Sequence, residues 1–222
     1  MKSIGNLTFI AGILVTTMEM AGQENHFSKE EYLTLHAQTE VSRAETDLDF
    51  KNEEKSPLVK DSIPNFMGLE YFEWNYLYII PAEFKRISDG REFEMKTTTE
   101  RLPLYRDFAL VIFTFGDSTY TLHAYQNVAY AKGAEYDSSL FIPFTDHTNG
   151  EESYGGGRYI DIKIPKGKKV ILDFNRAYNP YCAYNKRYSC PIPPMENALP
   201  FRVEAGVLSY HRDPDPSMKP SE

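Results

Sequence analysis

The stretch FALVIFTF at residues 108–115 is followed by the turn GDS at 116–118 and by TYTLHAYQ at 119–126. The first run is strongly apolar and contains the β-branched Val111 and Ile112, and the second alternates apolar with polar residues. Two such runs around a short glycine-containing turn are typical of a β-hairpin. Within that hairpin, His123 and Tyr125 are expected on the same face of the second strand.

Shorter runs with β character lie on both sides of this hairpin, at residues 76–80, 93–95, 140–142, 159–164, 169–174 and 201–208. The segment PKGK at 165–168 is a turn signal, so residues 159–174 are expected to form a second hairpin. Short strands separated by turns predict a mostly β fold, an antiparallel barrel or sandwich with one N-terminal α-helix.

The helix is predicted over residues 28–49. Ser28 and Glu31 have the spacing of a capping box, in which each side chain bonds to the other residue's backbone amide. Apolar residues then recur at steps of three and four, which is the period of one helix face. They are Leu33, Ala37, Val41, Ala44 and Leu48. The other face is expected to be charged and solvated, and residues 51–65 form a polar connector.

The overall composition limits the possible partners. A chain of 222 residues with 41% hydrophobic residues is sufficient for one domain with a packed core. The formal net charge of −8 provides no basic surface for a phosphate backbone, so nucleic acid is not expected as a partner. No run of about 20 apolar residues follows the N-terminus, so no internal membrane span is expected.

The N-terminus resembles a secretory signal peptide. Lys2 precedes an apolar stretch at residues 4–15, and small residues follow, with cleavage expected near Gly22. This predicts a secreted or periplasmic protein, although an ordinary apolar segment or an uncleaved membrane tether remains an alternative. We expect the following division: 1–22 signal peptide, 23–66 helix and connector, 67–212 β-rich domain, and 213–222 a frayed tail.

Two polar segments interrupt the strand pattern. The first is FTDHTNGEESYGGGRY at residues 144–159. Three consecutive glycines allow close backbone approach to a ligand, and their amides with Arg158 could bind an anion. The alternative is a tight bulged loop that leads into a strand.

The second segment, residues 173–199, begins DFNRAYNPYCAYNKRYSCPIPP. Its prolines stiffen a chain rich in hydrogen-bonding side chains, which favours a preorganised site. The alternative is a structural loop whose Asn and Asp side chains cap its own backbone. Since the predicted 159–174 hairpin joins the two segments, we expect both at the same end of the sheet.

The two cysteines, Cys182 and Cys190, have several interpretations. In an exported protein a disulfide is the first of these. Inert buried thiols, a metal site and a Cys nucleophile with His123 or His147 as base are the alternatives, and zinc is disfavoured because the usual paired spacing is missing. For His123 itself, a partly buried strand residue is favoured over a catalytic base.

The two polar segments, together with SPL at 56–58, GLEYF at 68–72 and EAG at 204–206, resemble a bacterial and archaeal family called domain of unknown function 1684. The resemblance extends over residues 27–208. Ala198 stands where the family pattern has Arg, so any role of that Arg is missing here. The resemblance implies a single folding unit and marks the same two segments, but it implies no reaction. The polar residues that match the family pattern are Asp146, Gly150, Tyr154, Gly155, Gly157, Arg158, Asp173, Asn175, Asn179, Cys182, Cys190, Asn197 and Glu204. Arg158, Asp173 and Glu204 are expected to form either an ion-pair network or a ligand site.

Three functions are compatible with these features. The favoured one is a module that binds a small ligand, anionic or sugar-like, between stacking tyrosines and Arg158, without a metal or cofactor. The predicted ligand-binding residues are Asp146, Tyr154, Gly155, Gly156, Gly157, Arg158, Asp173, Asn175, Tyr178, Asn179, Cys182, Asn197 and Glu204. The second function is a hydrolase with Asp146 or Asp173 as base and Arg158 stabilising negative charge. The third is a structural or protein-interaction domain, which would have no ligand-sized pocket.

Overall fold

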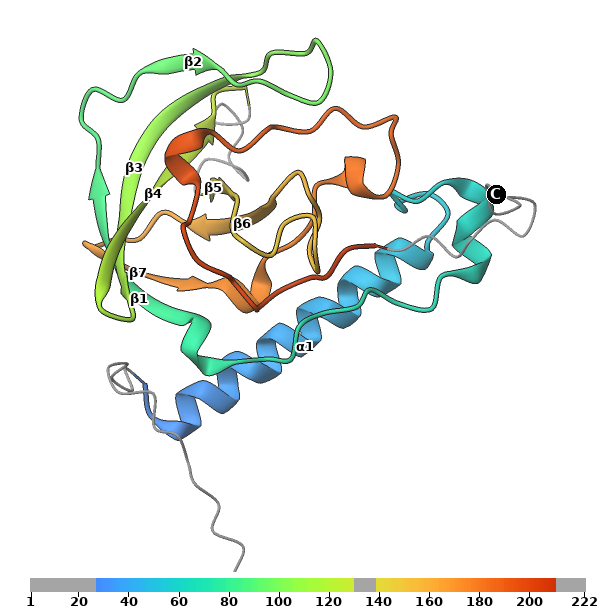
Figure 1. Ribbon diagram of the computed structural model, residues 1–222, viewed down its shortest axis with the longest axis horizontal. Coiled ribbons are helices and arrows are strands. Elements are labelled where there is room, and N and C mark those ends of the chain that lie inside the picture. Colours follow the sequence, from blue (N-terminus) through green and yellow to red (C-terminus); the bar gives the residue numbers. More distant parts are fainter. Residues whose placement is uncertain (1–26, 130–138, 211–222) are drawn as a thin grey trace, which may run out of the picture.

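The computed structural model describes residues 27–129 and 139–210. One antiparallel sheet curls into a half-barrel, and one long helix lies along its side (Figure 1). The predicted fold class, mostly β with one N-terminal helix, is confirmed. The predicted signal peptide and the whole of the predicted tail lie outside the described residues.

The sheet has seven strands in the order β6-β5-β4-β3-β1-β7, with β2 paired to β3. Their bounds are β1 Ile79–Arg86, β2 Glu92–Glu94, β3 Leu104–Phe115, β4 Ser118–Asn127, β5 Ser139–Phe144, β6 Arg158–Lys163 and β7 Lys169–Asp173. Short 3₁₀ turns occupy the connections: η1 Lys60–Asn65, η2 Tyr76–Tyr78, η4 Phe174–Arg176, η5 Tyr181–Ala183 and η6 Met195–Asn197.

The central hairpin is confirmed. Phe115 pairs with Ser118 across a two-residue turn. Gly116 has φ of +58° and the following Asp117 does not have a positive φ, which is the pattern of a type II′ turn. His123 and Tyr125 share a face as expected, since their rings stack with centroids 6.1 Å apart.

Strand alternation divides the sheet into two differently packed faces. Val111, Leu122, Ile142 and Ile160 point into the main core inside the half-barrel. On the opposite face Tyr105 and Tyr125 belong to a second, aromatic cluster together with Met95. This outer face is the one that the candidate site uses.

The helix α1 spans Lys29–Lys51, and its capping box between Ser28 and Glu31 is present as predicted. The predicted packing face is wrong. Leu33, Val41 and Leu48 are 57%, 58% and 67% exposed. The helix instead buries Thr39 and Phe50 and turns a polar face toward the sheet. The apolar spacing identifies a helix correctly but does not indicate its orientation, because α1 lines a cavity with polar side chains instead of packing an apolar face onto the sheet.

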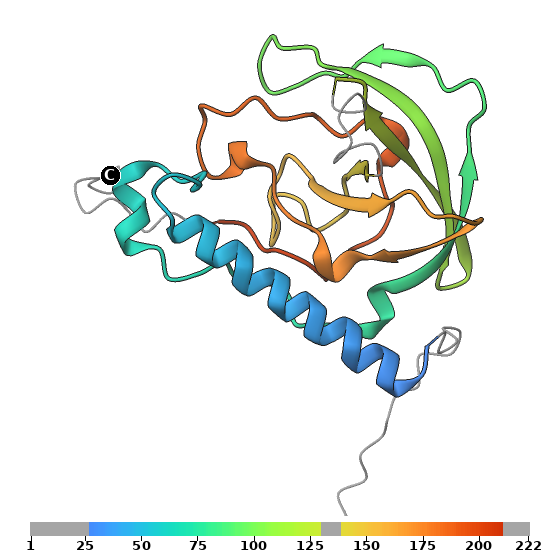
Figure 2. The ribbon, with the colours of Figure 1, turned by 180° about the vertical axis from the view of Figure 1, so that it is seen from behind.

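The second predicted hairpin is also wrong. Strands β6 and β7 are consecutive in the chain, yet β6 pairs with β5 and β7 pairs with β1. They therefore lie at the two ends of the strand order, joined by the short connection 164–168. This short connection holds the end of β6 close to the start of β7. Because these strands are the two edges of the sheet, the sheet has to curl to bring them together (Figure 2).

The last predicted strand, residues 201–208, is not in the sheet. It makes one isolated bridge, between Tyr71 and Val207, and buries Val203 and Ala205 in the main core. Arg158 takes the carbonyl groups of Val203 and Ala205 as hydrogen-bond acceptors. A side chain thus satisfies backbone groups that a neighbouring strand would otherwise satisfy.

Candidate functional site

Arg158 forms an internal cross-link. Its side chain is fully buried and forms an ion pair with Asp146, with 2.8 Å between Nη2 and Oδ2. The guanidinium also donates to the carbonyl of Val203 at 2.7 Å. Asp146 in turn accepts from the amides of Thr148 and Val203 at 2.9 and 3.0 Å. Burial lowers the pKa of Arg158, and the charge of Asp146 opposes that shift. This pair fastens the 201–208 segment to β6.

The glycines beside Arg158 have a steric role. Gly157 has φ of +86°, and a Cβ at this position would lie 2.5 Å from the carbonyl oxygen of Phe144. A Cβ on Gly156 would lie 2.5 Å from the ring of Tyr154. Only glycine fits these positions without displacing its neighbours, so the alternative of a tight loop leading into a strand accounts for this segment.

Four other predicted site residues make internal bonds. Asp173 accepts from the amide of Asn175 at 3.0 Å and so caps η4, and burial raises the pKa of Asp173. Asn197 donates to the carbonyls of His123 and Pro143, which links β4 to β5. Glu204 pairs with Arg202 at 3.0 Å and not with Arg158. The expected cluster of Arg158, Asp173 and Glu204 is therefore not formed, because Arg158 pairs with Asp146.

The two predicted segments do meet, at a different point from the glycines. Tyr159 and Tyr178 exchange backbone hydrogen bonds of 2.9 and 3.0 Å. Beside this contact lies a cavity of about 960 Å³, bounded by α1, by the outer face of β3 to β6 and by the loop around η5. Of the predicted ligand residues, Asn175, Tyr178 and Asn179 line it.

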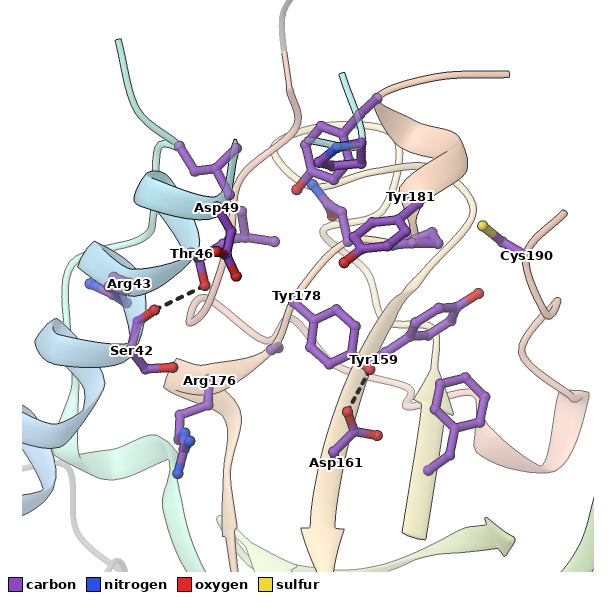
Figure 3. Close-up of a pocket in the computed structure, with 18 of the residues that line it drawn as sticks. Ser42, Arg43, Thr46, Asp49, Tyr159, Asp161, Arg176, Tyr178, Tyr181 and Cys190 are labelled. Atoms are coloured by element: carbon purple, nitrogen blue, oxygen red, sulfur yellow. Dashed lines mark hydrogen bonds between the residues drawn. The ribbon is translucent and has the colours of Figure 1, made fainter. Parts of the chain in front are cut away.

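One wall of the cavity consists of aromatic rings. They are Tyr105, Tyr125, Phe141, Tyr159, Tyr178 and Tyr181. Tyr105, Tyr125 and Tyr159 are buried in the wall, whereas Tyr178 and Tyr181 are 37% and 50% exposed. The opposite wall comes from α1, whose Ser42, Thr46 and Asp49 face the rings across the hollow (Figure 3).

Asp161 is a carboxylate set among these rings. It pairs with Phe141 across β5 and β6, and Phe141 itself pairs with Tyr125, so the three side chains share one face of the sheet. The hydroxyl of Tyr178 donates to Oδ2 of Asp161 at 2.7 Å (Figure 3). Solvent reaches Asp161 through the cavity. The protein atoms around the carboxylate raise its pKa, and the Tyr178 hydrogen bond opposes this.

The α1 side of the cavity carries charges of both signs, because Asp49 of α1 lines it and pairs with Lys55 at 2.8 Å. Arg43 lies over the ring of Tyr71, 4.2 Å from its centroid, and pairs with Glu40 at 3.0 Å. The side chain of Arg176, the last residue of η4, makes no hydrogen bond or ion pair within residues 27–129 and 139–210. The cavity thus has a carboxylate within an aromatic wall and guanidinium groups toward the helix.

The cysteines lie near this cavity, and Cys190 lines it. The expected disulfide is not formed in the structure, where both residues are free thiols. The amide of Cys182 donates to Sγ of Cys190 at 3.1 Å. The hydrogen bond between the thiols lowers the pKa of Cys182 and raises that of Cys190. A disulfide in an oxidising compartment stays a prediction, which the mass of the exported protein under non-reducing conditions would test.

Sequence reasoning missed Asp161, Arg43 and the rings of β3 to β5. A signal for Asp161 was present: in the string YIDIK of β6, Tyr159 and Asp161 alternate with Ile160 and Ile162. That alternation places an aromatic and an acidic residue together on the face away from the core. The opposing wall had no such signal, because α1 is distant in sequence.

Two further observations limit the chemistry. Within the described residues, no group of three or more His, Cys, Asp or Glu side chains is arranged to hold a metal ion. In the same ranges no helix is both long and apolar enough to cross a membrane.

Comparison with known proteins supports the fold and gives no activity. The family model "Protein of unknown function (DUF1684)" matches residues 64–208. The solution NMR structure of the uncharacterized protein from gene locus rrnAC0354 of Haloarcula marismortui is 32% identical to this chain. The similarity covers 82% of this chain and 97% of that one, with a TM-score of 0.65. No curated protein matches. Because the family model matches more than half of this chain, the chain belongs to the DUF1684 family.

Proposed function

We propose that this protein binds a small organic molecule in the tyrosine-walled cavity between α1 and β6. The cavity itself carries the proposal. Its volume of about 960 Å³ lies at the upper end of the ~300–1,000 Å³ range of small-molecule sites. Its wall is mainly aromatic with a few placed polar groups, which is the usual composition of such sites.

Three side chains give the proposed site its binding character. Tyr178 and Tyr181 expose large parts of their rings to the hollow, where a ring or alkyl group can stack. Asp161 offers a carboxylate whose described partner is the Tyr178 hydroxyl alone. A carboxylate at the edge of a stacking surface fixes the orientation of a ligand that carries a donor group.

The alternative functions have less support. Asp146 and Asp173 both accept internal hydrogen bonds, so the geometry does not support a hydrolase in which either carboxylate is the base. An interaction domain would lack a ligand-sized hollow, and the cavity counts against it.

The proposal includes export. Support comes from the N-terminal sequence, in which Lys2 is followed by an apolar stretch and small residues. The mature protein is expected outside the cytoplasm with an N-terminus near Gln23. N-terminal sequencing of the protein from each cell fraction tests this, and an intact Met1 in the cytoplasmic fraction would contradict it.

Thermal unfolding against a panel of sugars, carboxylates, phosphates and amines tests the binding function. A ligand present at about 100 times its Kd should stabilise the protein by about 2.7 kcal/mol. Tyr181→Ala is expected to remove the shift. Tyr76→Ala is the matched control, because Tyr76 is 46% exposed and lies outside the cavity. A panel without any stabilising compound, or a shift that survives Tyr181→Ala, would refute the proposal.

A further inference from the structure

We infer that the cavity takes an organic cation, an alkylammonium or guanidinium group, held between tyrosine rings with Asp161 as its counter-ion. The inference rests on the proposed function and names the ligand class for the same site. It follows from the arrangement of the rings, from the charge they surround and from the small number of metal-binding groups nearby.

The rings form a corner rather than a flat stack. Tyr159 and Tyr178 are almost perpendicular, at 86°, with centroids 5.7 Å apart. Phe141 meets Tyr159 at 75° with centroids 4.6 Å apart. Perpendicular neighbours present ring faces in different directions, as a cage for a cation requires, whereas a flat sugar face is met by one exposed ring face.

The charge inside this corner is negative, and none of the basic side chains in the described ranges pairs with it. Asp161 projects from β6 beside Tyr159 and receives a hydrogen bond from the Tyr178 hydroxyl, which uses only part of its acceptor capacity. No Lys, Arg or His of the described residues lies within ion-pair distance of Asp161. A carboxylate amid ring faces attracts a cation through both ion pairing and the ring quadrupoles.

The same surroundings disfavour a metal ion. One carboxylate and a tyrosine hydroxyl supply too few ligands for Ca²⁺ or Mg²⁺, which require six or more oxygen ligands or several retained waters. Across the cavity, Arg43 and Arg176 would repel a second positive charge. The ligand is therefore a monocation, or a zwitterion whose acidic end lies toward α1.

Calorimetric titration with tetramethylammonium, choline, n-butylammonium and methylguanidinium tests the inference. The neutral comparison compound is 3,3-dimethylbutan-1-ol, which has the shape of choline without its charge. We expect choline to bind at least about tenfold more tightly than this isostere, since a cation over desolvated rings gains that much or more. Asp161→Asn should remove the preference, and Asp117→Asn, an exposed turn residue remote from the cavity, should keep it.

The outcomes separate the two proposals. If the isostere binds as tightly as choline, or if Asp161→Asn retains the preference, the cation inference is wrong. If a sugar or an anion binds and none of the four cations does, the inference is wrong while the proposed function stands. If no compound of any class binds, both are wrong. Circular dichroism of Asp161→Asn establishes that this variant is folded before its titration is interpreted.

Discussion

Replacing Arg158 by methionine is expected to destabilise the fold by about 3–5 kcal/mol, the usual cost of breaking a buried ion pair by removing one partner. Arg158 and Asp146 are both fully buried as side chains, so the Asp146 carboxylate would be left without its cation. The carbonyls of Val203 and Ala205 would lose a donor as well, and an unsatisfied buried acceptor costs about 1–3 kcal/mol. Urea unfolding gives the free energy directly, and for a chain of this size the Tm should fall by roughly 6–20 °C.

The matched control is Arg202→Met. Arg202 forms ion pairs with Glu151, Glu152 and Glu204, but its side chain is 36% exposed. Surface pairs of this kind contribute about 0–1 kcal/mol, so this variant should remain near wild-type stability. If Arg158→Met is as stable as Arg202→Met, the internal cross-link is wrong. If it is stable and also fails to bind a ligand that the wild type binds, Arg158 is a site residue after all.

Three further predictions follow from burial and backbone geometry. Burial raises the pKa of Asp161 in the folded protein, so above that pKa the ionised carboxylate lowers the stability of the fold. Asp161→Asn should therefore withstand more urea than wild type at neutral pH. Below the ordinary aspartate pKa, where the carboxyl group is protonated in both states, the difference should vanish. Val41→Ser, at a 58% exposed position of α1, should change the unfolding free energy by less than about 0.5 kcal/mol. Phe50→Ala, at a buried position of the same helix, should lower it by about 3–5 kcal/mol. Equal losses would contradict the observed helix orientation. Gly157→Ala should lower the unfolding free energy by about 1–3 kcal/mol or more, because Gly157 has a positive φ and lies close to the Phe144 carbonyl. Gly167→Ala, with open space around it, should leave the unfolding free energy unchanged in the same assay.

Local patterns predicted the elements of this fold well and their arrangement poorly. The β3–β4 hairpin was predictable because its turn residues and its alternation lie within twenty neighbouring residues. The pairing of β6 and β7 was not, since a short connection is compatible with a hairpin and equally with two edges of a curled sheet. Long-range strand order depends on how the whole sheet closes, and no local signal encodes that.

The same limit applies to the candidate site. The segment 173–199 was predicted to contribute, and Tyr178 and Asn179 do line the cavity. Arg158 was predicted as a ligand group because a charged residue beside glycines has the same sequence appearance whether it binds an anion or fastens a loop. Its role becomes visible only with its partners, which come from residues 146 and 203–205.

The most direct test of the account is a ligand-bound structure of the full chain with the best-binding compound from the thermal-unfolding panel and the calorimetric titration. We predict that the compound lies between α1 and β6, in contact with Tyr178 and Asp161, and that a cationic group points at the Asp161 carboxylate. A compound bound instead at Gly155–Gly157, or on the outer surface of α1, would contradict the assignment of this cavity as the binding site.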